Sequence, residues 1–320
     1  MAKTLEERGY YIIDVHGHHG NYKGGKLPPV TKQALALREY LEHKTGTLED
    51  LMAELPTEEQ TVELFKKYGI KAAPVAWTAL VARGEMGQDN DYIYELVKRH
   101  PDVFIGFWGS VDPRLGQIAL EEAERCFRDL KVIGLKFQQA SQEFCVNDPQ
   151  FYPLWDLCQQ YGAWVQFHGG MTGLGTGAPG GAGIKTIKYT NPADVDEVAA
   201  DFPKLNIILM HACEPFTEIA NLVTLHKGNI YRETSGMWPQ YFPEIMVYEM
   251  NRRLRDKYMF GSEYPYFDIE RLLDQHEEME REGKYREGIL EKLFYKNALN
   301  NLGERFENVG ADLSPWKGLV

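Results

Sequence analysis

Apolar positions along the chain come in short continuous runs, separated by longer stretches in which apolar and polar residues alternate with helical spacing. The first run covers residues 10–15, and the others cover 69–77, 103–109, 132–137, 163–167, 205–210, 228–232 and 257–260. Continuous apolar runs of this length are typical of parallel strands that are buried on both faces. The pattern therefore predicts strands in all of these runs.

Helical spacing fills most of the intervening sequence. We expect helices at residues 57–68, 90–100, 115–129, 149–161, 192–202, 214–226, 238–252, 268–282 and 286–302, the first of them capped by Thr57. Residues 19–56 are predicted to form a lid-like insertion with a helical stretch at 31–43, and residues 303–320 a C-terminal tail. The alternation favours an α/β fold, a closed (β/α)8 TIM-type barrel that forms a single domain over residues 1–320. An open doubly wound sheet is the alternative, which periodicity alone does not exclude.

Composition and charge narrow the class of protein. No stretch approaches about 18 consecutive apolar residues, and the N-terminus has no apolar core, so the sequence predicts neither a membrane span nor a secretory signal. The four cysteines have no paired spacing, which favours reduced thiols in a cytoplasmic enzyme. A net charge of −12 argues against a nucleic-acid partner. It also means that an anionic substrate would need a local positive centre, such as a metal.

Metal-binding residue types stand where the predicted strands end. His16 and His18 follow the first strand, and residues of the same kind end three later strands, namely His168, His211 and Glu263. In a barrel the carboxyl ends of all strands meet at one mouth, so we expect these side chains to converge. Imidazoles with one carboxylate suit a divalent metal. A scatter of solvent-facing histidines, or a closed structural zinc site, is the alternative reading.

Seven short motifs, in this order and spacing, carry a family resemblance over nearly the whole chain. They are Ile13-Asp-Val-His-Gly-His, Phe104-Ile-Gly-Phe-Trp-Gly-Ser-Val-Asp-Pro, Ile133-Gly-Leu-Lys-Phe, Phe167-His-Gly-Gly, Met210-His-Ala, Phe260-Gly-Ser-Glu-Tyr-Pro and Lys296-Asn-Ala. The chain resembles the aminocarboxymuconate-semialdehyde decarboxylase-like branch of the amidohydrolase superfamily. The resemblance implies a homodimer and one divalent metal, usually Zn²⁺, with Mn²⁺ or Fe²⁺ as alternatives. It assigns the metal to His16, His18, His168 and Glu263, and a substrate-facing role to His211.

Two features set this chain apart from the common family pattern. The family usually has Asp where this chain has Glu263, and Glu at this place resembles the branch that contains oxalomesaconate hydratase and carbon–carbon hydrolases of the lignin pathway. Residues 169–183 contain eight glycines in 15 positions. That run resembles family members that hydrolyse β-ketoacyl thioesters of aromatic acids, although a flexible lid without specific chemistry is the alternative. It lacks the Gly-Lys-Ser/Thr ending of a phosphate-binding loop.

These features favour hydrolysis of a carbon–carbon bond next to a carbonyl in a small aromatic-derived or β-ketoacyl substrate. Metal-activated water would attack the carbonyl, with Glu263 and His211 as acid/base groups. The alternative is a non-oxidative decarboxylase of an aromatic or muconate-type carboxylic acid, or a related hydratase. An amidase or lactonase, and a binding protein without catalysis, remain further alternatives.

Other polar and aromatic residues near the strand ends are candidates for smaller roles. Lys136 matches the place where some amidohydrolases carry a carbamylated lysine between two metals, although the mononuclear branch has a lysine there too. Candidates for substrate contact are His19, Arg83, Arg114, Trp238 and Tyr264, with Trp77, Trp108 and Tyr266 as further aromatic wall or core residues. Asp14 is expected to support the site by a hydrogen bond. We expect surface positions for His43, His100, His226 and His276.

Overall fold

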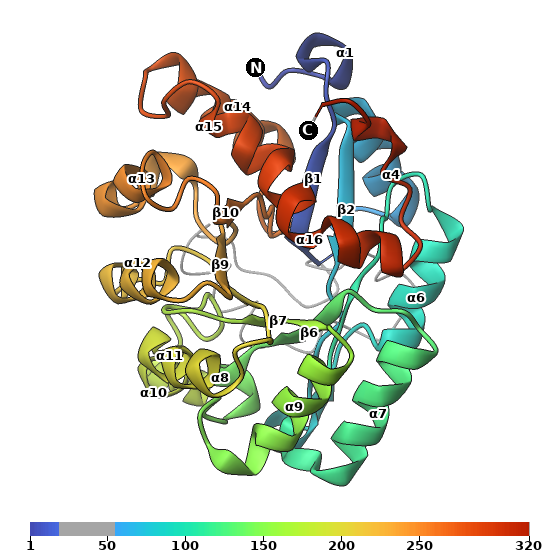
Figure 1. Ribbon diagram of the computed structural model, residues 1–320, viewed down its shortest axis with the longest axis vertical. Helices are drawn as coiled ribbons and strands as arrows, with labels where there is room; N and C mark the ends of the chain where they lie inside the picture. The colour runs from blue at the N-terminus through green and yellow to red at the C-terminus, as the bar shows by residue number, and fades with distance from the viewer. Residues whose placement is uncertain (19–54, 320) are drawn as a thin grey trace.

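Parallel strands lie in a ring at the centre of the molecule, and helices surround them (Figure 1). The computed structural model describes residues 1–18 and 55–319. In that part of the chain the ring strands are β1 (Ile12–Gly17), β2 (Ile70–Pro74), β5 (Trp108–Gly109), β6 (Gly134–Phe137), β7 (Trp164–Phe167), β8 (Ile207–Leu209), β9 (Ile230–Glu233) and β10 (Tyr258–Met259). Strands β5 to β10 pair in sequence order, each with the next and all in parallel.

Contacts at both edges of this sheet close the ring into a barrel. β1 pairs in parallel with β2, and parallel bridges join Ala72 to Phe104 and Val75 to Trp108, the first residue of β5. On the other edge, the Val15 N–H donates to the Phe260 carbonyl at 3.0 Å, which joins β1 to the end of β10. The predicted (β/α)8 barrel is therefore confirmed, and the open doubly wound sheet is excluded.

Most of the predicted helices are present, with shifted ends. The described α-helices are α1 (Leu5–Arg8), α4 (Glu58–Tyr68), α5 (Leu80–Arg83), α6 (Asn90–Arg99), α7 (Gln117–Arg128), α8 (Gln139–Gln142), α9 (Tyr152–Gln160), α10 (Thr186–Tyr189), α11 (Pro192–Asp201), α12 (Thr217–His226), α13 (Glu244–Met250), α14 (Ile269–Arg281), α15 (Ile289–Glu291) and α16 (Asn297–Asn308). Thr57 caps α4 as predicted, because its hydroxyl accepts the Gln60 N–H at 3.2 Å while the Gln60 side chain accepts the Thr57 N–H at 2.8 Å.

The two segments predicted at the margins of the barrel have different outcomes. Residues 19–54 lie outside the described residues. They include most of the lid-like insertion, and His19 and His43 are among them. The helix expected to end near residue 302 continues as α16 to Asn308, inside the segment predicted as a tail. Further along that segment Trp316 is buried, and its indole N–H donates to the Tyr11 carbonyl at 3.0 Å.

Several short elements at the barrel mouth were not predicted from the sequence. They are the antiparallel pair β3 (Thr78–Ala79) and β4 (Glu85–Met86), and the single-turn helices α5, α8 and α10. Elements of two to four residues are too short to show a hydrophobic period. None of the described helices combines the length and the apolar character needed to cross a membrane.

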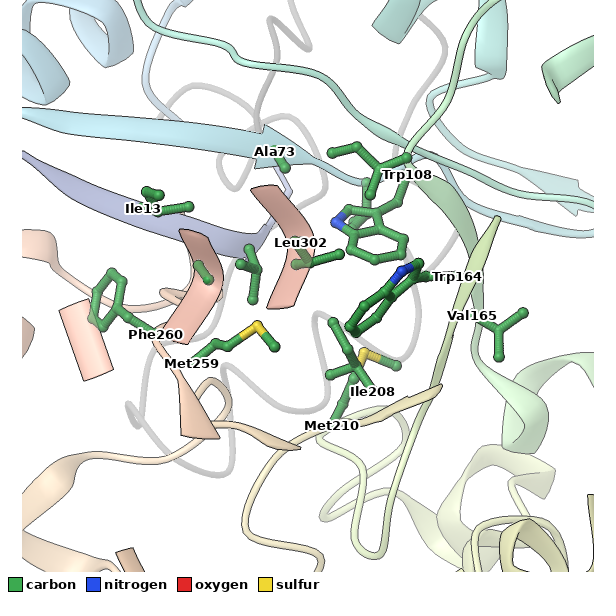
Figure 2. Packing of buried hydrophobic residues seen from close by; sticks show 14 of the residues in the cluster. Ile13, Ala73, Trp108, Trp164, Val165, Ile208, Met210, Met259, Phe260 and Leu302 are labelled. Carbon is green, nitrogen blue, oxygen red and sulfur yellow. The ribbon is translucent and has the colours of Figure 1, made fainter. Parts of the chain in front are cut away.

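The barrel interior changes from apolar to polar along its axis. Side chains that include Trp108, Trp164, Ile208 and Met259 pack together in its middle (Figure 2). Trp108 is fully buried there, so it belongs to the core. Towards the carboxyl ends of the strands the buried positions become polar, with Asp14, Lys136, Gln166 and Glu233. The apolar layer thus supports a polar layer directly beneath the mouth.

Candidate active site

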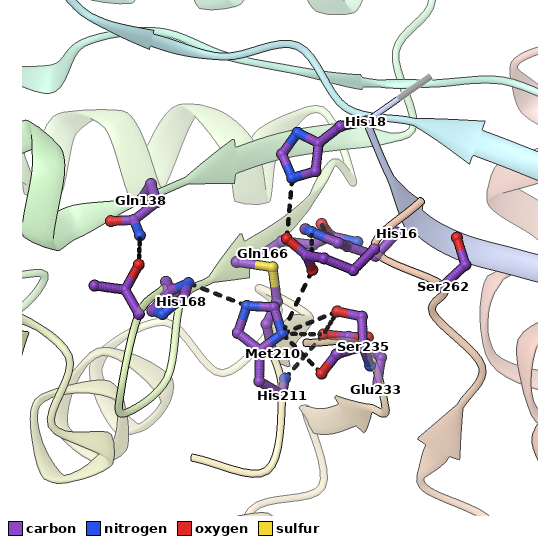
Figure 3. Close-up of polar contacts among 12 residues, drawn as sticks. His16, His18, Gln138, Gln166, His168, Met210, His211, Glu233, Ser235 and Ser262 are labelled. Carbon is purple, nitrogen blue, oxygen red and sulfur yellow. Dashed lines mark hydrogen bonds and ion pairs between the residues drawn. The ribbon is translucent and has the colours of Figure 1, made fainter. Parts of the chain in front are cut away.

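Four imidazoles meet at the carboxyl ends of the strands (Figure 3), and the Glu263 carboxylate lies among them. His16 Nε2 lies 3.2 Å from Glu263 Oε2, and His18 Nε2 lies 3.2 Å from Glu263 Oε1. His211 Nδ1 lies 3.8 Å from Glu263 Oε2. The loop after β10 therefore places its carboxylate between histidines that belong to β1 and to the end of β8.

The donor set fits a divalent cation. Ligand atoms of His16, His211 and Glu263 all lie within 4.8 Å of one another. His16 Nε2 and Glu263 Oε2 are buried, and neither makes a hydrogen bond although they are 3.2 Å apart. Buried polar atoms without a hydrogen bond are costly, and a cation bound by both atoms would remove that cost. Neutral imidazoles with one carboxylate are a ligand set that zinc, manganese and iron accept.

His168 stands beside this group and is held in a row of hydrogen bonds. Its Nε2 lies 3.0 Å from the Met171 carbonyl, and its Nδ1 lies 3.1 Å from His211 Nε2. The carbonyl can only accept, so a neutral His168 donates from Nε2 and accepts at Nδ1. His211 Nδ1 lies 3.1 Å from the Ser235 carbonyl, which can only accept, and 2.9 Å from the Ser235 hydroxyl, which donates to Glu233 Oε1 at 2.9 Å. Both nitrogens of His211 therefore face acceptors. His168 could bind a metal through Nδ1 only if it gave up its contact with His211.

A buried carboxylate below His211 fixes that residue in place. Glu233 accepts the backbone N–H of His211 at 2.9 Å and that of Ser235 at 2.6 Å. Two glycines make room for this arrangement. A Cβ on Gly261 would lie 2.1 Å from Glu233 Oε2, and a Cβ on Gly236 would lie 2.8 Å from His211 Nδ1.

Glu233 and Ser235 were missed from the sequence. Both are buried at the end of β9, where the run Tyr231-Arg-Glu-Thr-Ser is unusually polar for a buried strand. That polarity could have identified them, because a charged side chain is almost never fully buried unless it has a partner.

The backbone is strained at two of the site residues. His211 has φ 66° and Glu263 has φ 55°, a left-handed conformation that non-glycine residues rarely adopt. Such strain persists only where the surroundings enforce it, and it concentrates at functional sites. Asp14 enforces it near Glu263, because its carboxylate accepts the His16 N–H at 3.1 Å and the Ser262 N–H at 3.0 Å. The supporting hydrogen bond predicted for Asp14 is therefore confirmed.

Burial and charge set the protonation of the site. Burial lowers the pKa of His18 to about 4 and that of His211 to about 4, and it lowers the pKa of His168 well below its usual range. Burial would also lower the pKa of His16, but the Glu263 carboxylate raises it above the ordinary value. Burial acts to raise the pKa of Glu263, yet His16 and His18 hold it well below its usual range. Mostly neutral imidazoles around an ionised carboxylate are the state that metal binding requires.

The two predicted arginines are engaged with a shared carboxylate. Arg83 Nη2 lies 3.2 Å from Glu143 Oε1, and Arg114 Nη1 lies 3.8 Å from Glu143 Oε2. Arg83 also donates to the Ala182 carbonyl at 3.4 Å, at the end of the glycine-rich run. The structure therefore gives both arginines an intramolecular partner near the mouth.

The aromatic candidates divide between the site and the barrel wall. The Tyr264 ring packs on Phe65, 5.2 Å between centroids, and its hydroxyl lies 3.2 Å from the Thr61 hydroxyl, beneath α4. Trp238 packs on Phe267, 4.8 Å between centroids. Tyr266, by contrast, has its ring 5.5 Å from that of His18.

The remaining histidines divide between surface and core. His226 is exposed as predicted, and His100 is half-buried against Glu58. The surface position predicted for His276 is wrong, because its side chain is fully buried among aromatic rings.

Comparisons with known proteins agree with this fold. Over 79 residues, or 25% of this chain, the sequence is 29% identical to 2-amino-3-carboxymuconate-6-semialdehyde decarboxylase of Dictyostelium discoideum, and the match spans 22% of that relative's own length. An uncharacterized TIM-barrel protein of Bordetella bronchiseptica is similar in structure, with a TM-score of 0.73 at 20% identity over 93% of this chain and 99% of that one.

Two solved decarboxylases share the fold at lower identity. The 5-carboxyvanillate decarboxylase of Novosphingobium aromaticivorans, solved with manganese and 3-methoxy-4-hydroxy-5-nitrobenzoic acid, matches with a TM-score of 0.65 at 15% identity over 95% of this chain and 100% of that one. A dihydroxybenzoic acid decarboxylase of a Polaromonas species was solved with manganese and 2-nitroresorcinol. It matches with a TM-score of 0.62 at 17% identity, over 94% of this chain and 99% of that one.

The sequence profile of one family covers most of the chain. Its match extends over residues 13–303, from β1 into α16, and includes all five residues that meet at the mouth. This chain belongs to the amidohydrolase family.

Proposed function

We propose that this protein is a metal-dependent, non-oxidative decarboxylase of a small aromatic or muconate-type carboxylic acid. This was the second of the two reactions inferred from the sequence. Proteins named as decarboxylases support this proposal in two ways. One resembles this chain in sequence over 25% of its length, and two share its fold over 94–95% of its length. Hydrolysis of a carbon–carbon bond has no comparable support.

The observation that carries the proposal is the placement of Glu263. Its Oε1 faces His18 at 3.2 Å, and its Oε2 faces His16 at 3.2 Å and His211 at 3.8 Å. Both oxygens face imidazole nitrogens that a shared cation would bind, because Oε1 pairs with His18 while Oε2 is buried opposite His16 without a hydrogen bond. Glu263 is therefore placed to hold a metal. A carboxylate engaged by a metal in this way is a poor base for water, and hydrolysis would require such a base.

We assign the metal to His16, His18, His168 and Glu263, with Zn²⁺ as the proposed ion and Mn²⁺ as the alternative. A divalent metal supplies a positive centre for the substrate's carboxylate and a neighbouring oxygen. Loss of the contact between His168 and His211 would leave His211 Nε2 free to face the substrate. Ser235 contacts the ring from the other side, and Glu233 accepts the backbone N–H of His211.

His211 is proposed as the proton donor. The bond between the ring carbon and the carboxyl group breaks, and its electron pair stays on the carbon. The negative charge of a bound substrate would raise the pKa of His211, so that it donates as the imidazolium. Its Nε2 proton takes the place of the carboxyl group, carbon dioxide leaves, and the neutral imidazole that remains takes up a proton from solvent. A positioned donor of this kind contributes about 100- to 10,000-fold in rate.

The test is a substrate panel in oxygen-18 water. The panel contains 2,6-dihydroxybenzoate, 5-carboxyvanillate, muconate-type ring-cleavage products and β-ketoacyl thioesters of aromatic acids. We expect carbon dioxide release from an acid in the panel, with no label in the organic product. Labelled organic product without carbon dioxide would contradict decarboxylation and restore hydrolysis.

We also propose a cytoplasmic homodimer. All four cysteines are free, which is consistent with a reducing compartment. Helices α12 and α13 expose apolar side chains that a second copy could cover, namely Ile219, Leu222, Leu225, Ile245 and Tyr248. Sedimentation velocity should show a dimer that Leu222→Glu weakens, and a monomeric wild type would contradict the proposal.

A further inference from the structure

Lys136 places a buried ammonium group inside the barrel. It lies on β6 in register with Gln166 on β7. The Gln166 side chain points inward, where it contacts His16 Nδ1 at 2.9 Å and donates to the Val15 carbonyl at 2.9 Å. Register partners on adjacent parallel strands point to the same side. Lys136 therefore points into the barrel interior beneath the site, and its side chain is only 2% exposed.

This ammonium group has no counter-ion in the described part of the chain. Its Nζ forms neither a hydrogen bond nor an ion pair within 4.0 Å with any described residue. The two nearby carboxylates are engaged elsewhere, Glu263 by His16 and His18 and Glu233 by backbone N–H groups. Its positive charge nevertheless reaches the site, since it lowers the pKa of His18 and of His211 in addition to the larger effect of burial.

Other cations near the mouth already have partners. Arg83 and Arg114 share Glu143. Arg232 donates to the His211 carbonyl at 2.8 Å and to Asn221 at 2.9 Å. A buried charge is normally paired, so an ammonium group without a partner calls for an anion from outside the chain. A divalent metal at the mouth would add further positive charge, which also favours an anionic ligand.

We propose that Lys136 is a substrate-binding residue, which holds a carboxylate oxygen of the acid through its ammonium group. The substrate class in this assignment rests on the proposed function. The ammonium group attracts the carboxylate of an acid and has no such attraction for a neutral analogue. Because the acid carries this charge from the moment it binds, the interaction strengthens substrate binding. Its loss should therefore raise KM more than it lowers kcat.

The experiment measures binding by calorimetry with the metal-loaded, full-length protein. The probes are 2,6-dihydroxybenzoate and resorcinol, which lacks the carboxylate. Lys136→Met should bind the acid about 10- to 100-fold more weakly, the usual range for a lost charged hydrogen bond, and resorcinol as well as wild type does. Lys136→Arg keeps the charge and should retain the preference for the acid. Lys71→Met is the matched control, because Lys71 lies on β2 at the opposite end of the barrel and donates to the Asp102 carbonyl.

Metal content and thermal stability of each variant are measured in parallel. If Lys136→Met loses the metal or the fold, Lys136→Gln takes its place in the same comparison. Equal weakening of both probes would show a structural role, and unchanged acid binding would show no role; either result overturns the assignment. So would a wild-type protein that binds neither probe. Lysine-dependent binding of the acid without carbon dioxide release from any acid would contradict the decarboxylase and leave the assignment of Lys136 standing.

Discussion

His211 and His276 are both buried histidines with lowered pKa values, yet their surroundings differ in kind. Burial lowers the pKa of His211 to about 4 and that of His276 to about 3. His211 contacts another imidazole and a serine hydroxyl, and it faces two carboxylates. His276 contacts the Tyr285 hydroxyl at 3.1 Å and lies among the rings of Phe242, Phe260 and Phe294.

The difference shows what marks a site in this barrel. Burial and a lowered pKa are common to both histidines, so neither property identifies function. The convergence of several ligand-type side chains from separate strands does, because no apolar core requires it. We therefore expect substitutions at the mouth to change chemistry, and substitutions around His276 to change stability.

The largest effect is expected for His211→Ala. Because His211 is the proposed proton donor and lies outside the proposed ligand set, the variant should keep its metal and lose about 100- to 10,000-fold in rate. Steady-state kinetics with metal analysis measures both. His100→Ala, which removes a histidine paired with Glu58 away from the mouth, is the control. Near-normal turnover in His211→Ala would place His211 with His276 as a structural residue.

A smaller loss is expected for Glu233→Gln. The amide nitrogen would face a backbone N–H that the carboxylate now accepts, so His211 would lose part of its support. Loss of such a support typically costs about 10- to 100-fold in activity. Glu277→Gln is the matched control, because Glu277 is also a buried carboxylate but pairs with Arg8 away from the mouth. It should lower stability and leave the rate unchanged, and equal rates for both variants would contradict the positioning role of Glu233.

His276 should act through the pH dependence of stability. Its pKa is about 3 in the folded protein and near its ordinary value of 6.5 when unfolded. Between these values the unfolded chain binds a proton that the folded protein does not, so this residue lowers stability as the pH falls below 6.5. From pH 7 to pH 5 its contribution is roughly 2 kcal/mol.

Denaturant unfolding of wild type and His276→Phe at pH 7 and pH 5 isolates the contribution of His276 to the pH dependence of stability. The variant should lose less stability between pH 7 and pH 5, because Phe cannot bind the proton. Its activity per folded molecule should stay normal. Identical pH slopes for the two proteins would show that His276 titrates in the folded state.

The smallest effect is expected for Glu263→Asp. If residue 263 only holds the metal, the shorter carboxylate restores the residue that the family commonly has here, and the rate should fall by less than about 10-fold. If it served as a base for water, displacement by more than about 1 Å should cost about 100-fold. A large loss of kcat with full metal content would favour hydrolysis over decarboxylation.

The sequence predicts the mouth of this barrel well, because residues that end parallel strands must meet there whatever the loops do. The buried position of His276 was also readable, since Ile269, Leu272, Leu273, His276 and Met279 follow one helical face. The prediction failed because the polar neighbours of His276 received more weight than this spacing.

Other features could not be read from the sequence. Arg83 and Glu143 are 60 positions apart and meet only because α5 and α8 fold against each other at the mouth. The support of His211 by Glu233, and the lack of a counter-ion for Lys136, likewise depend on how side chains from several strands pack. Such contacts follow from tertiary structure and leave no periodic pattern.

Metal content of His16→Ala and His276→Ala, measured beside wild type, tests the central contrast most directly. His16 Nε2 is the buried imidazole nitrogen that faces Glu263 without a hydrogen bond, whereas His276 belongs to the core. Wild type and folded His276→Ala should each carry about one equivalent of a divalent metal, and His16→Ala should carry almost none. Full metal content in His16→Ala, or none in wild type purified with zinc or manganese, would contradict the account.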